Sequence, residues 1–278
     1  MARSILHRLG SALVVMIGIS MLIFAIARVM PGDPARIALG PNATQEQVEA
    51  LRAARHLDAP LPIQYWEFVK SLAEGDLGRS LYTNRPVTTD IAQFLPATLE
   101  LAFVSAILMV LIGLPLGVVA AHFRGRGLDH LARFLALLAI CTPAFVWGVI
   151  FQLVFAWWMG WFPIEGQLSS SLTPPPAATG FILIDSALAG NTRAFADALH
   201  HLVLPALALA LSGIGQVARL TRSNMAEVYD RPYVEMARAY GYKGRRIATK
   251  WAFRPAFIPT LTILGLEFAA LLGTAFLV

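Results

Sequence analysis

The stretch RLTRSNMAEVYDRPYVEMARAYGYKGRRIATKWAFRPAFIP, residues 219–259, is the most highly charged part of a very apolar chain. Between Arg219 and Arg254 it holds nine Lys and Arg against three acids, a net charge of +6. The whole 278-residue chain has a formal net charge of +5, so the residues outside this stretch sum to −1. Basic residues gathered between two apolar segments are typical of a membrane protein, in which loop charge sets the topology.

The composition supports the same class of protein. Hydrophobic residues make up 57% of the chain and charged residues 14%, with a mean hydropathy of +0.63. These values predict an all-α polytopic membrane protein and exclude a soluble domain. The pI near 9.7 would suggest nucleic acid as a partner of a soluble protein, but here the charge lies between membrane segments. The single cysteine, Cys141, excludes a disulfide framework.

Apolar runs of about 20 residues, the length that crosses a bilayer, recur through the chain. We expect membrane spans at residues 9–29, 97–121, 131–158 and 201–217, and a fifth from near Ala256. Thr142-Pro143 should bend the third span, and Pro205 should kink the fourth. The sequence stops at Val278 inside an apolar run, which leads us to expect a sixth span beyond it.

Two further features bear on these spans. Ala25-Ile26-Ala27 resembles a signal-peptidase site, but the apolar run before it exceeds the usual h-region of roughly 7–15 residues, which favours an uncleaved first span. In the second span, Gly113, Pro115 and Gly117 predict a kink or a close helix contact. In the fifth span, the small residues Gly265, Ala269 and Gly273 suit close helix packing.

Residues 31–95 should form a small folded element outside the membrane, between a first helix at 1–30 and a core at 96–278. The element opens with a turn at Pro31-Gly32-Asp33-Pro34. Thr44 and Gln47 have capping-box spacing and predict a short amphipathic helix. A second helix is expected over residues 62–73, with Ile63, Trp66 and Val69 on one face, and Gly75-Asp76-Leu77-Gly78 should end it.

The distribution of charge predicts the orientation. The N-terminus, the 122–133 loop and the 219–254 stretch are positive, whereas residues 30–95 and 162–199 each sum to −2. By the positive-inside rule, the N-terminus and the basic loop are cytoplasmic and residues 31–95 are extracytoplasmic.

No catalytic or metal site is indicated by the sequence. It contains no phosphate-binding GxxxxGK[ST] loop, no HExxH and no paired carboxylates within a span. His200-His201 at the start of a helix could be metal ligands, but no third ligand sits nearby, so an interfacial position is the better interpretation. We therefore predict that the chain is not an enzyme.

Glu267 is the carboxylate expected in the middle of a span, where an ionisable group is costly and often functional. One interpretation is that it faces a water-filled translocation pathway, to which Thr142 and Gln152 are further candidates. The alternatives are a buried hydrogen bond to a neighbouring helix or a neutral, protonated acid. Glu100 and Arg28 lie nearer the interfaces and are given no role.

The basic stretch has three possible roles: docking to a partner, topogenic charge alone, or binding of nucleic acid or anionic lipid. Apolar residues are interleaved with its charges, which disfavours a continuous basic face. Two short helices, 233–240 and 244–253, with a corner at Gly241 would make a rigid cytoplasmic knob. Docking of this knob in a cleft of another protein is therefore preferred, and nucleic acid is the least favoured partner.

These residues also resemble a known family. Glu235-Met-Ala-Arg-Ala-Tyr-Gly241 resembles the EAA motif of ABC importer permeases, and 219–259 as a whole is similar to its version in the peptide/nickel branch. The first span with MPGDPA, then LDAPLPIQYWEFVKSLAEGDLGRSL, then HHLVLPALALALSGIGQVARLTRS resemble the first permease subunit of that branch. The resemblance covers essentially the whole chain. It departs at Met236, which replaces the first Ala of EAA, and at Trp251-Ala-Phe-Arg254, where the motif has a proline.

The resemblance implies a type I ABC importer permease fold in a bacterial plasma membrane. It implies a second homologous permease subunit as heterodimer partner, two cytoplasmic ABC ATPases that bind the ATP and Mg²⁺, and an extracytoplasmic solute-binding protein docking on residues 31–95, with lipid around the spans and no cofactor in this chain. The coupling loop would be residues 219–255. Its coupling residues would be Tyr233, Glu235, Ala237, Arg238, Ala239, Gly241, Arg245 and Arg246.

The solute implied by the resemblance is a di- or oligopeptide. Nickel chelates, glutathione, opines and oligosaccharides are alternatives within the same importer class. A secondary transporter driven by an ion gradient through Glu267 is a more distant alternative, but no inverted internal repeat supports it.

Overall fold

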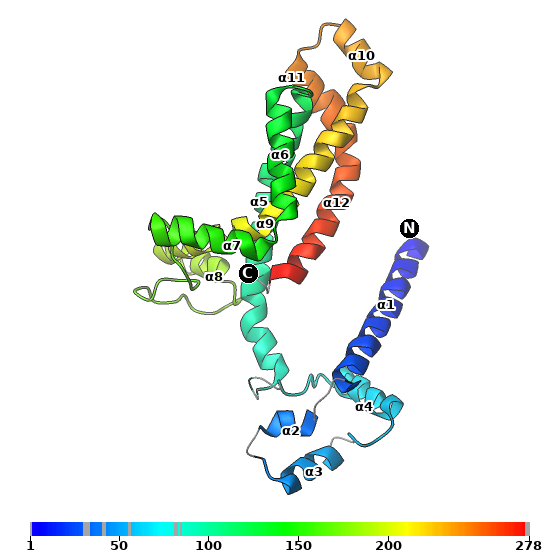
Figure 1. The fold of residues 1–278 in the computed structure, drawn as a ribbon, viewed down its shortest axis with the longest axis vertical. Coiled ribbons are helices and arrows are strands. Elements are labelled where there is room, and N and C mark those ends of the chain that lie inside the picture. Colours follow the sequence, from blue (N-terminus) through cyan, green and yellow to red (C-terminus); the bar gives the residue numbers. More distant parts are fainter. Residues whose placement is uncertain are drawn as a thin grey trace. The chain divides into compact units, whose positions relative to one another are not determined.

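The computed structural model describes residues 2–29, 34–40, 43–54, 57–80, 83 and 85–275. Within these residues the regular elements are helices, apart from an isolated bridge between Arg79 and Pro86. The chain divides into two compact units, residues 1–93 and 94–278 (Figure 1). The predicted turn at Pro31-Gly32-Asp33 lies outside the described residues.

The first unit consists of one long apolar helix and three short helices. Its elements are α1 (Ala2–Val29), α2 (Pro34–Leu39), α3 (Gln45–Ala54), α4 (Leu61–Ala73) and the first turns of α5 (Val87–His122). The predicted capping box is confirmed, since the Thr44 amide donates to Gln47 Oε1 at 3.0 Å and the Gln47 amide donates to Thr44 Oγ1 at 3.3 Å. Gly75 has φ +84° and ends α4 as expected.

Helix α4 packs against α1 through aromatic residues. Tyr65 and Phe68 form ring contacts with Phe24 of α1. By contrast, Ile63 and Trp66 are 51% and 68% exposed. The aromatic residues that contact α1 are therefore the packing face, and Ile63 and Trp66 of the predicted face lie on the exposed side.

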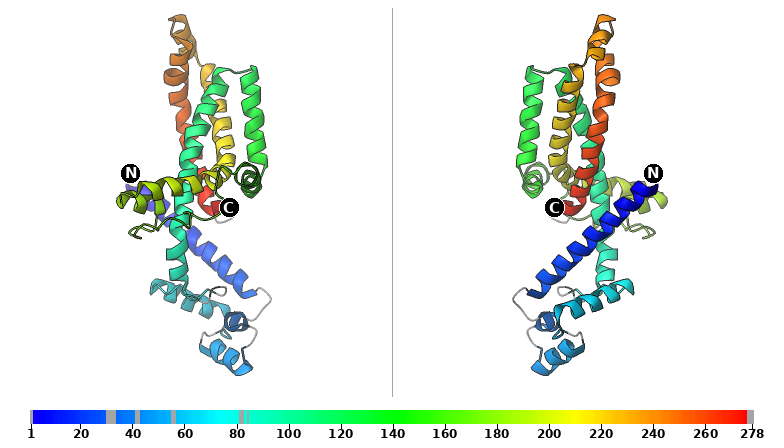
Figure 2. Two further views of the ribbon diagram at one scale, coloured as in Figure 1. Left: turned by 90° about the vertical axis from the view of Figure 1, so that its left-hand side faces the viewer. Right: turned by 90° about the vertical axis from the view of Figure 1, so that its right-hand side faces the viewer.

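The second unit is a bundle around α9 (Thr192–Tyr229). Helices α5, α6 (Gly127–Cys141), α9 and α12 (Phe253–Thr274) run side by side (Figures 1 and 2). The short helix α10 (Pro232–Ala239) and α11 (Gly244–Arg246) lie at one end of this bundle. At the other end lie α7 (Ala144–Phe151), the π-helical segment η1 (Gln152–Trp158) and α8 (Ile182–Leu188).

Five predicted spans have counterparts in the described helices. Four helical segments are long and apolar enough to cross a membrane: Ile5–Ile26, Val87–His122, Thr192–Tyr229 and Gly244–Thr274. The pair formed by α6 and α7–η1 is the fifth candidate. The chain is therefore a multi-pass membrane protein. The boundaries differ from expectation, because the fourth span begins before residue 201 and runs past 217, and the fifth begins at Gly244 instead of near Ala256.

The third predicted span is broken, not merely bent. The helices on either side of Thr142-Pro143 meet at 103°. Pro143 disfavours a helical conformation at Thr142, which has φ −100° and ψ 125°, so α6 ends at Cys141. The residues after the break are nevertheless helical, first as α7 and then as η1.

Helix α9 is the centre of the bundle because its small residues let the neighbours come close. Ala206, Ala208 and Ala210 have no exposed surface. A Cβ added at Gly215 would lie 2.7 Å from the carbonyl oxygen of Ala136 on α6. In membranes, where burial of apolar surface drives helices together only weakly, such close contact is a main source of stability.

The predicted contacts of the second span are confirmed and those of the fifth are not. Gly113 and Gly117 of α5 lie directly against Val217 and Thr221 of α9. In α12, a Cβ added at Gly265 or Gly273 would meet no atom within 4 Å. Within the described residues, the small-residue stripe of α12 is therefore an open surface.

Helix α8 is fixed to α5 by a residue that was given no role in the sequence. Glu100 is only 6% exposed and accepts hydrogen bonds from the amides of Ile182, at 3.3 Å, and Leu183, at 2.8 Å. A carboxylate at the first turn of a helix satisfies amides that have no partner in the helix itself. Glu100 thereby joins the polar segment 162–191 to the bundle.

We predict that Gly117→Ala destabilises the protein by about 1–3 kcal/mol, the usual cost of overpacking. The new Cβ would lie 2.6 Å from Thr221 Cβ and 2.7 Å from the Ala218 carbonyl oxygen. The measurement is the thermal midpoint of unfolding of the detergent-solubilised chain, with size-exclusion chromatography used to detect the fraction that stays folded at each temperature. Gly18→Ala on α1 is the matched control, since its Cβ meets no atom within 4 Å. Equal midpoints for the two variants would contradict the close contact.

Candidate functional site

The α10 end of the bundle holds the residues that the sequence proposed for coupling. Pro232 occupies the first turn of α10, where a missing amide hydrogen has no cost. The helix ends in a Schellman motif, in which the Gly241 amide donates to the Arg238 carbonyl at 2.9 Å and the Tyr242 amide donates to the Ala237 carbonyl at 3.2 Å. Gly241 has φ +76°, so the predicted glycine corner is confirmed.

One face of α10 is anchored on the bundle. Val234 is fully buried and Ala237 is 3% exposed. Val234 belongs to an apolar cluster drawn from the ends of α5, α9 and α12 and from the π-helical segment η2 (Ile247–Ala252). The other buried members of this cluster are Ala121, Met225, Tyr229, Ile247, Ala248, Ala252 and Ala256. Helix α10 is therefore a fixed part of the bundle end.

The other face of α10 is uncovered and partly apolar. Tyr233, Met236 and Tyr240, which we call the α10 ridge, are 36%, 55% and 75% exposed. Their spacing of three and four residues places them along one side of the helix. Glu235 and Ala239 are exposed beside them.

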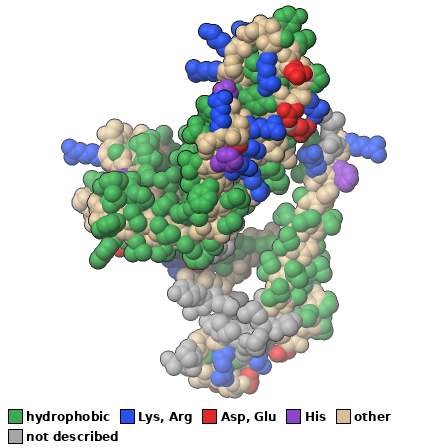
Figure 3. All heavy atoms as spheres, turned by 45° about the horizontal axis from the view of Figure 1, so that its top comes forward, with side chains coloured by type: hydrophobic (Ala, Val, Ile, Leu, Met, Phe, Trp, Pro, Cys, Tyr) green, Lys and Arg blue, Asp and Glu red, His purple; other side chains and the backbone are tan. Residues whose placement is uncertain are grey.

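Positive charge surrounds the ridge. Lys and Arg side chains gather over the end of the bundle that carries α10 and α11 (Figure 3). The guanidinium of Arg238 lies 5.7 Å from the ring centre of Tyr229, and that of Arg246 lies 5.0 Å from that of Tyr242. These cation–π contacts hold the two arginines against the bundle. Arg245 is exposed on α11.

The eight predicted coupling residues thus share one end of the bundle, with two corrections. Ala237 packs inward and is not part of the exposed surface. The second helix, expected as a separate element over 244–253, is instead continuous through α11 and η2 with α12. Since α9 also continues to Tyr229, only residues 230–243 of the expected loop 219–255 lie outside the long helices, and they form α10 and the two turns beside it.

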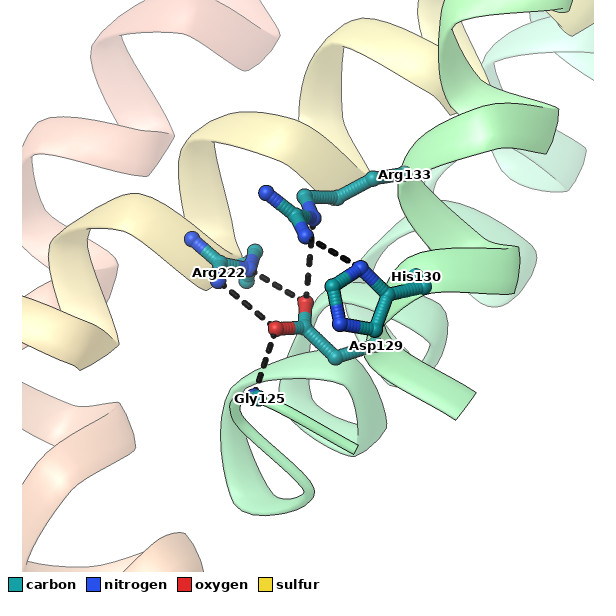
Figure 4. A network of polar contacts seen from close by, with 5 residues as sticks. All are labelled: Gly125, Asp129, His130, Arg133 and Arg222. Atoms are coloured by element: carbon teal, nitrogen blue, oxygen red, sulfur yellow. Dashed lines mark hydrogen bonds and ion pairs between the residues drawn. The ribbon is translucent and has the colours of Figure 1, made fainter. Parts of the chain in front are cut away.

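A charged network that the sequence did not single out lies beside this surface (Figure 4). Asp129, at the start of α6, has no exposed surface. Arg222 of α9 donates to its two oxygens at 2.6 and 2.8 Å, and the Gly125 amide donates at 2.9 Å. Arg133 approaches the same carboxylate at 3.7 Å and contacts His130 at 2.7 Å. The bidentate pair fastens the first turn of α6 to α9.

The sequence contained one signal of this network. Asp129 is the only acid in the otherwise basic 122–133 segment. Its partner Arg222 lies 93 residues away, and no local pattern connects the two.

The three proposed pathway residues lie on separate elements. Glu267 is half-buried on α12, with Oε2 3.7 Å from where a Cβ would stand at Gly213 of α9. Thr142 occupies the break between α6 and α7. Gln152 donates to the Ile164 carbonyl at 3.1 Å and lines a hollow of about 400 Å³ beside Glu165 and Pro205. No hydrogen bond links these three residues to one another.

The carboxylate of Glu267 has no hydrogen bond or ion pair with any described residue. The alternative of a buried hydrogen bond to a neighbouring helix is therefore not observed. The two histidines weighed as ligands have protein partners: His200 contacts the Trp161 carbonyl and His201 the Asp197 carbonyl, both at 2.9 Å. Among the described residues no group of three or more His, Cys, Asp or Glu could hold a metal ion.

Comparison with known proteins identifies the family. Residues 113–278 match the model of the binding-protein-dependent transport system inner membrane component, and residues 1–102 match the model of its N-terminal region. The chain belongs to this permease family. The resemblance found in the sequence is thereby confirmed, and so is the type I ABC importer permease fold.

Curated relatives match the permease over nearly its full length. It is 43% identical over 271 residues to the probable D,D-dipeptide transport system permease protein DdpB of Escherichia coli. This alignment covers 98% of this chain and 80% of the relative. The di/tripeptide transport system permease protein DppB of Pseudomonas aeruginosa is 39% identical over 274 residues, with 98% and 81% covered. The dipeptide transport system permease protein DppB of Escherichia coli is 36% identical over 280 residues, with 100% and 83% covered.

We predict that Asp129→Asn destabilises the permease because Arg222 loses its charged partner inside the protein. Breaking a buried ion pair costs about 3–5 kcal/mol, and the low end applies because 21% of the Arg222 side chain is exposed. The measurement is the thermal midpoint of the purified chain.

The matched control is Asp230→Asn, which breaks the pair between Arg124 and Asp230. Their side chains are 51% and 67% exposed, so its loss should cost about 0–1 kcal/mol. If the two variants melted at the same temperature, the Asp129 network would not be a structural fastening.

Proposed function

We propose that this permease is one half of the translocation pathway of an ATP-driven, binding-protein-dependent importer of di- or oligopeptides. The observation that carries the proposal is the α10 ridge, an exposed apolar surface on a helix whose opposite face is anchored in the bundle. A surface of this kind fits a cleft of a partner protein, because the partner can cover apolar side chains that the permease leaves in water.

The partners of the α10 ridge are two cytoplasmic ATPases, one of which receives this helix. The sequence has no phosphate-binding loop, which is consistent with ATP being bound by another subunit. Closure of the ATPases on ATP would move α10. Because α10 is fixed to the ends of α5, α9 and α12, its movement would rock these helices between inward- and outward-open states.

The proposed orientation places the N-terminus and the α10 end in the cytoplasm of a bacterium. The support is the positive-inside rule, since the N-terminal segment, residues 122–133 and residues 219–254 are all basic. Residues 31–95 then face the solute-binding protein. The open stripe of Gly265, Ala269 and Gly273 suits close packing against the second permease subunit.

A peptide is the proposed solute because three relatives are named as permeases of dipeptide or di/tripeptide systems. Nickel chelates, glutathione, opines and oligosaccharides remain the alternatives named for this importer class. The direct experiment is uptake of labelled peptides by the reconstituted transporter with its binding protein. ATP dependence in the presence of an ionophore separates this function from ion-coupled transport.

The coupling role is tested by Glu235→Arg and Gly241→Val. The first reverses a charge beside the α10 ridge, and the second places a β-branched residue at φ +76°, which only glycine adopts without strain. We expect normal membrane insertion, with peptide-stimulated ATPase activity and uptake lowered by about tenfold or more, the equivalent of about 1.4 kcal/mol of docking free energy.

Lys250→Gln serves as the control for these variants, because Lys250 is an exposed cation on η2, outside α10. It should retain uptake. Normal uptake together with normal ATPase association in Glu235→Arg and Gly241→Val would overturn the coupling role of α10.

The pathway role of Glu267 is tested separately. We expect Glu267→Leu to lower peptide uptake severalfold, because it replaces a carboxylate without a described partner by an apolar group in a wetted passage. Glu267→Gln, of the same shape and still polar, should retain more uptake than the leucine variant. Transport by Glu267→Leu at the wild-type rate would remove Glu267 from the pathway.

A further inference from the structure

Helix α4 contacts α1 within the apolar segment of α1. The exposed apolar segment Ile5–Ile26 of α1 is 22 residues long, about 33 Å at 1.5 Å per residue, which matches the roughly 30 Å hydrocarbon core. Within it, Ser20 Oγ lies 2.8 Å from the Tyr65 hydroxyl of α4. Ser20 precedes Ile26 by six residues, so this contact lies about 9 Å inside the apolar segment.

A second contact fixes the depth of α4 independently. The ring of Phe24 lies 5.4 Å from that of Tyr65 and 5.7 Å from that of Phe68, between centres. Phe24 lies about 3 Å inside the end of the same segment. The two contacts place α4 about 3–9 Å deep, the range in which amphipathic helices lie at a bilayer surface, about 5–10 Å.

The side of α4 that faces the extramembrane element is identified by its hydrogen bonds. Gln64 is 8% exposed, and its Nε2 donates to the carbonyls of Leu57 and Ala59, both at 2.8 Å. With 3.6 residues per turn, Ser71 and Glu67 share the Gln64 side. The polar side of α4 is therefore turned toward the segment that precedes it.

The opposite side of α4 is apolar, and among the described residues it is exposed at Trp66 and partly exposed at Val69. Trp66 and Val69 project there, away from Gln64, and Trp66 is 68% exposed. Tryptophan is the residue enriched where a membrane meets water, because its ring is apolar and its N–H needs a polar partner. Lys70 lies at the border between the two sides, where its long side chain can reach the headgroups.

We propose that α4 is an interfacial helix whose Trp66 and Val69 side lies in the lipid of one leaflet. The lipid is the occupant because the contacts with Ser20 and Phe24 put α4 at the depth of the apolar segment of α1, and Trp66 is 68% exposed at that depth. Of the element at 31–95, the charged helix α3 and its neighbour α2 are then the part left for a soluble partner. The inference requires only that α1 spans the membrane, and it holds for any solute and either orientation.

The test uses site-directed spin labelling of the full transporter in liposomes. In a Cys141→Ala background, single variants Trp66→Cys and Glu67→Cys are labelled and their accessibility to oxygen and to a water-soluble nickel chelate is measured. We expect the oxygen-to-nickel accessibility ratio to be severalfold higher at position 66 than at position 67. Val14→Cys on α1 and Glu46→Cys on α3 serve as lipid and water references.

Two outcomes would overturn the proposal. A label at position 66 that is as open to the nickel chelate as the label at position 46 would place this side of α4 in water. A label at position 66 protected from both reagents would show that protein covers it, either the binding protein or another transmembrane subunit. Retained ATPase activity confirms that each labelled variant is folded, so failure of the membrane placement is distinct from failure of the transport function.

Discussion

The bundle depends on the close approach of backbones along α9. In lipid, apolar side chains gain little by leaving their solvent, so helices associate where small residues allow dense van der Waals contact. Gly113 and Gly117 of α5 meet α9 on one side, and Gly215 of α9 meets the backbone of α6 on another. Each contact is too short for a Cβ without a shift of its neighbours. These contacts hold the three helices together as one packed body.

The same helix connects the membrane part to the α10 end. Arg222 lies where α9 leaves its most apolar portion, and its pair with Asp129 fixes the start of α6 to α9. Seven residues later α9 ends at Tyr229, whose buried ring supports both Val234 of α10 and the guanidinium of Arg238. A force on α10 would therefore act on several helices at once, which rigid-body alternating access requires.

Local signals in the sequence were sufficient for local structure. The Thr44–Gln47 capping box and the Gly241 corner were predicted because each depends on residues within one turn. Family membership could also be predicted from the sequence, since the motif around Glu235–Gly241 and the other family motifs occur in the family's order along the chain. The pairing of charged residues far apart in the sequence could not be predicted. Asp129 and Arg222 were counted as loop charges, whereas in the structure they form a buried pair between α6 and α9.

The prolines in the sequence predicted where a helix could bend, but they did not predict how far the chain turns there. A proline removes one backbone hydrogen bond, but the surrounding packing decides how far the chain turns. A 103° break occurs at Pro143, whereas Pro115 and Pro205 lie inside continuous helices. The same uncertainty affects two candidate pathway residues. Thr142 and Gln152 were expected within one bent span, but Thr142 lies at the break and Gln152 lies beyond it, in η1.

The departure of this chain from the usual motif at Trp251-Ala-Phe-Arg254 can now be interpreted. The expected proline at this point would have separated the second loop helix from the last span. Instead, η2 absorbs the irregularity as a π-helical turn, and the helix passes through it into α12 without a break. Pro255 lies directly after this π-helical turn, at the third residue of α12. The turns at Asp230-Arg231 and Gly241–Lys243 therefore connect α10 to its neighbours, and beyond the second turn one continuous helix runs to the level of Glu267.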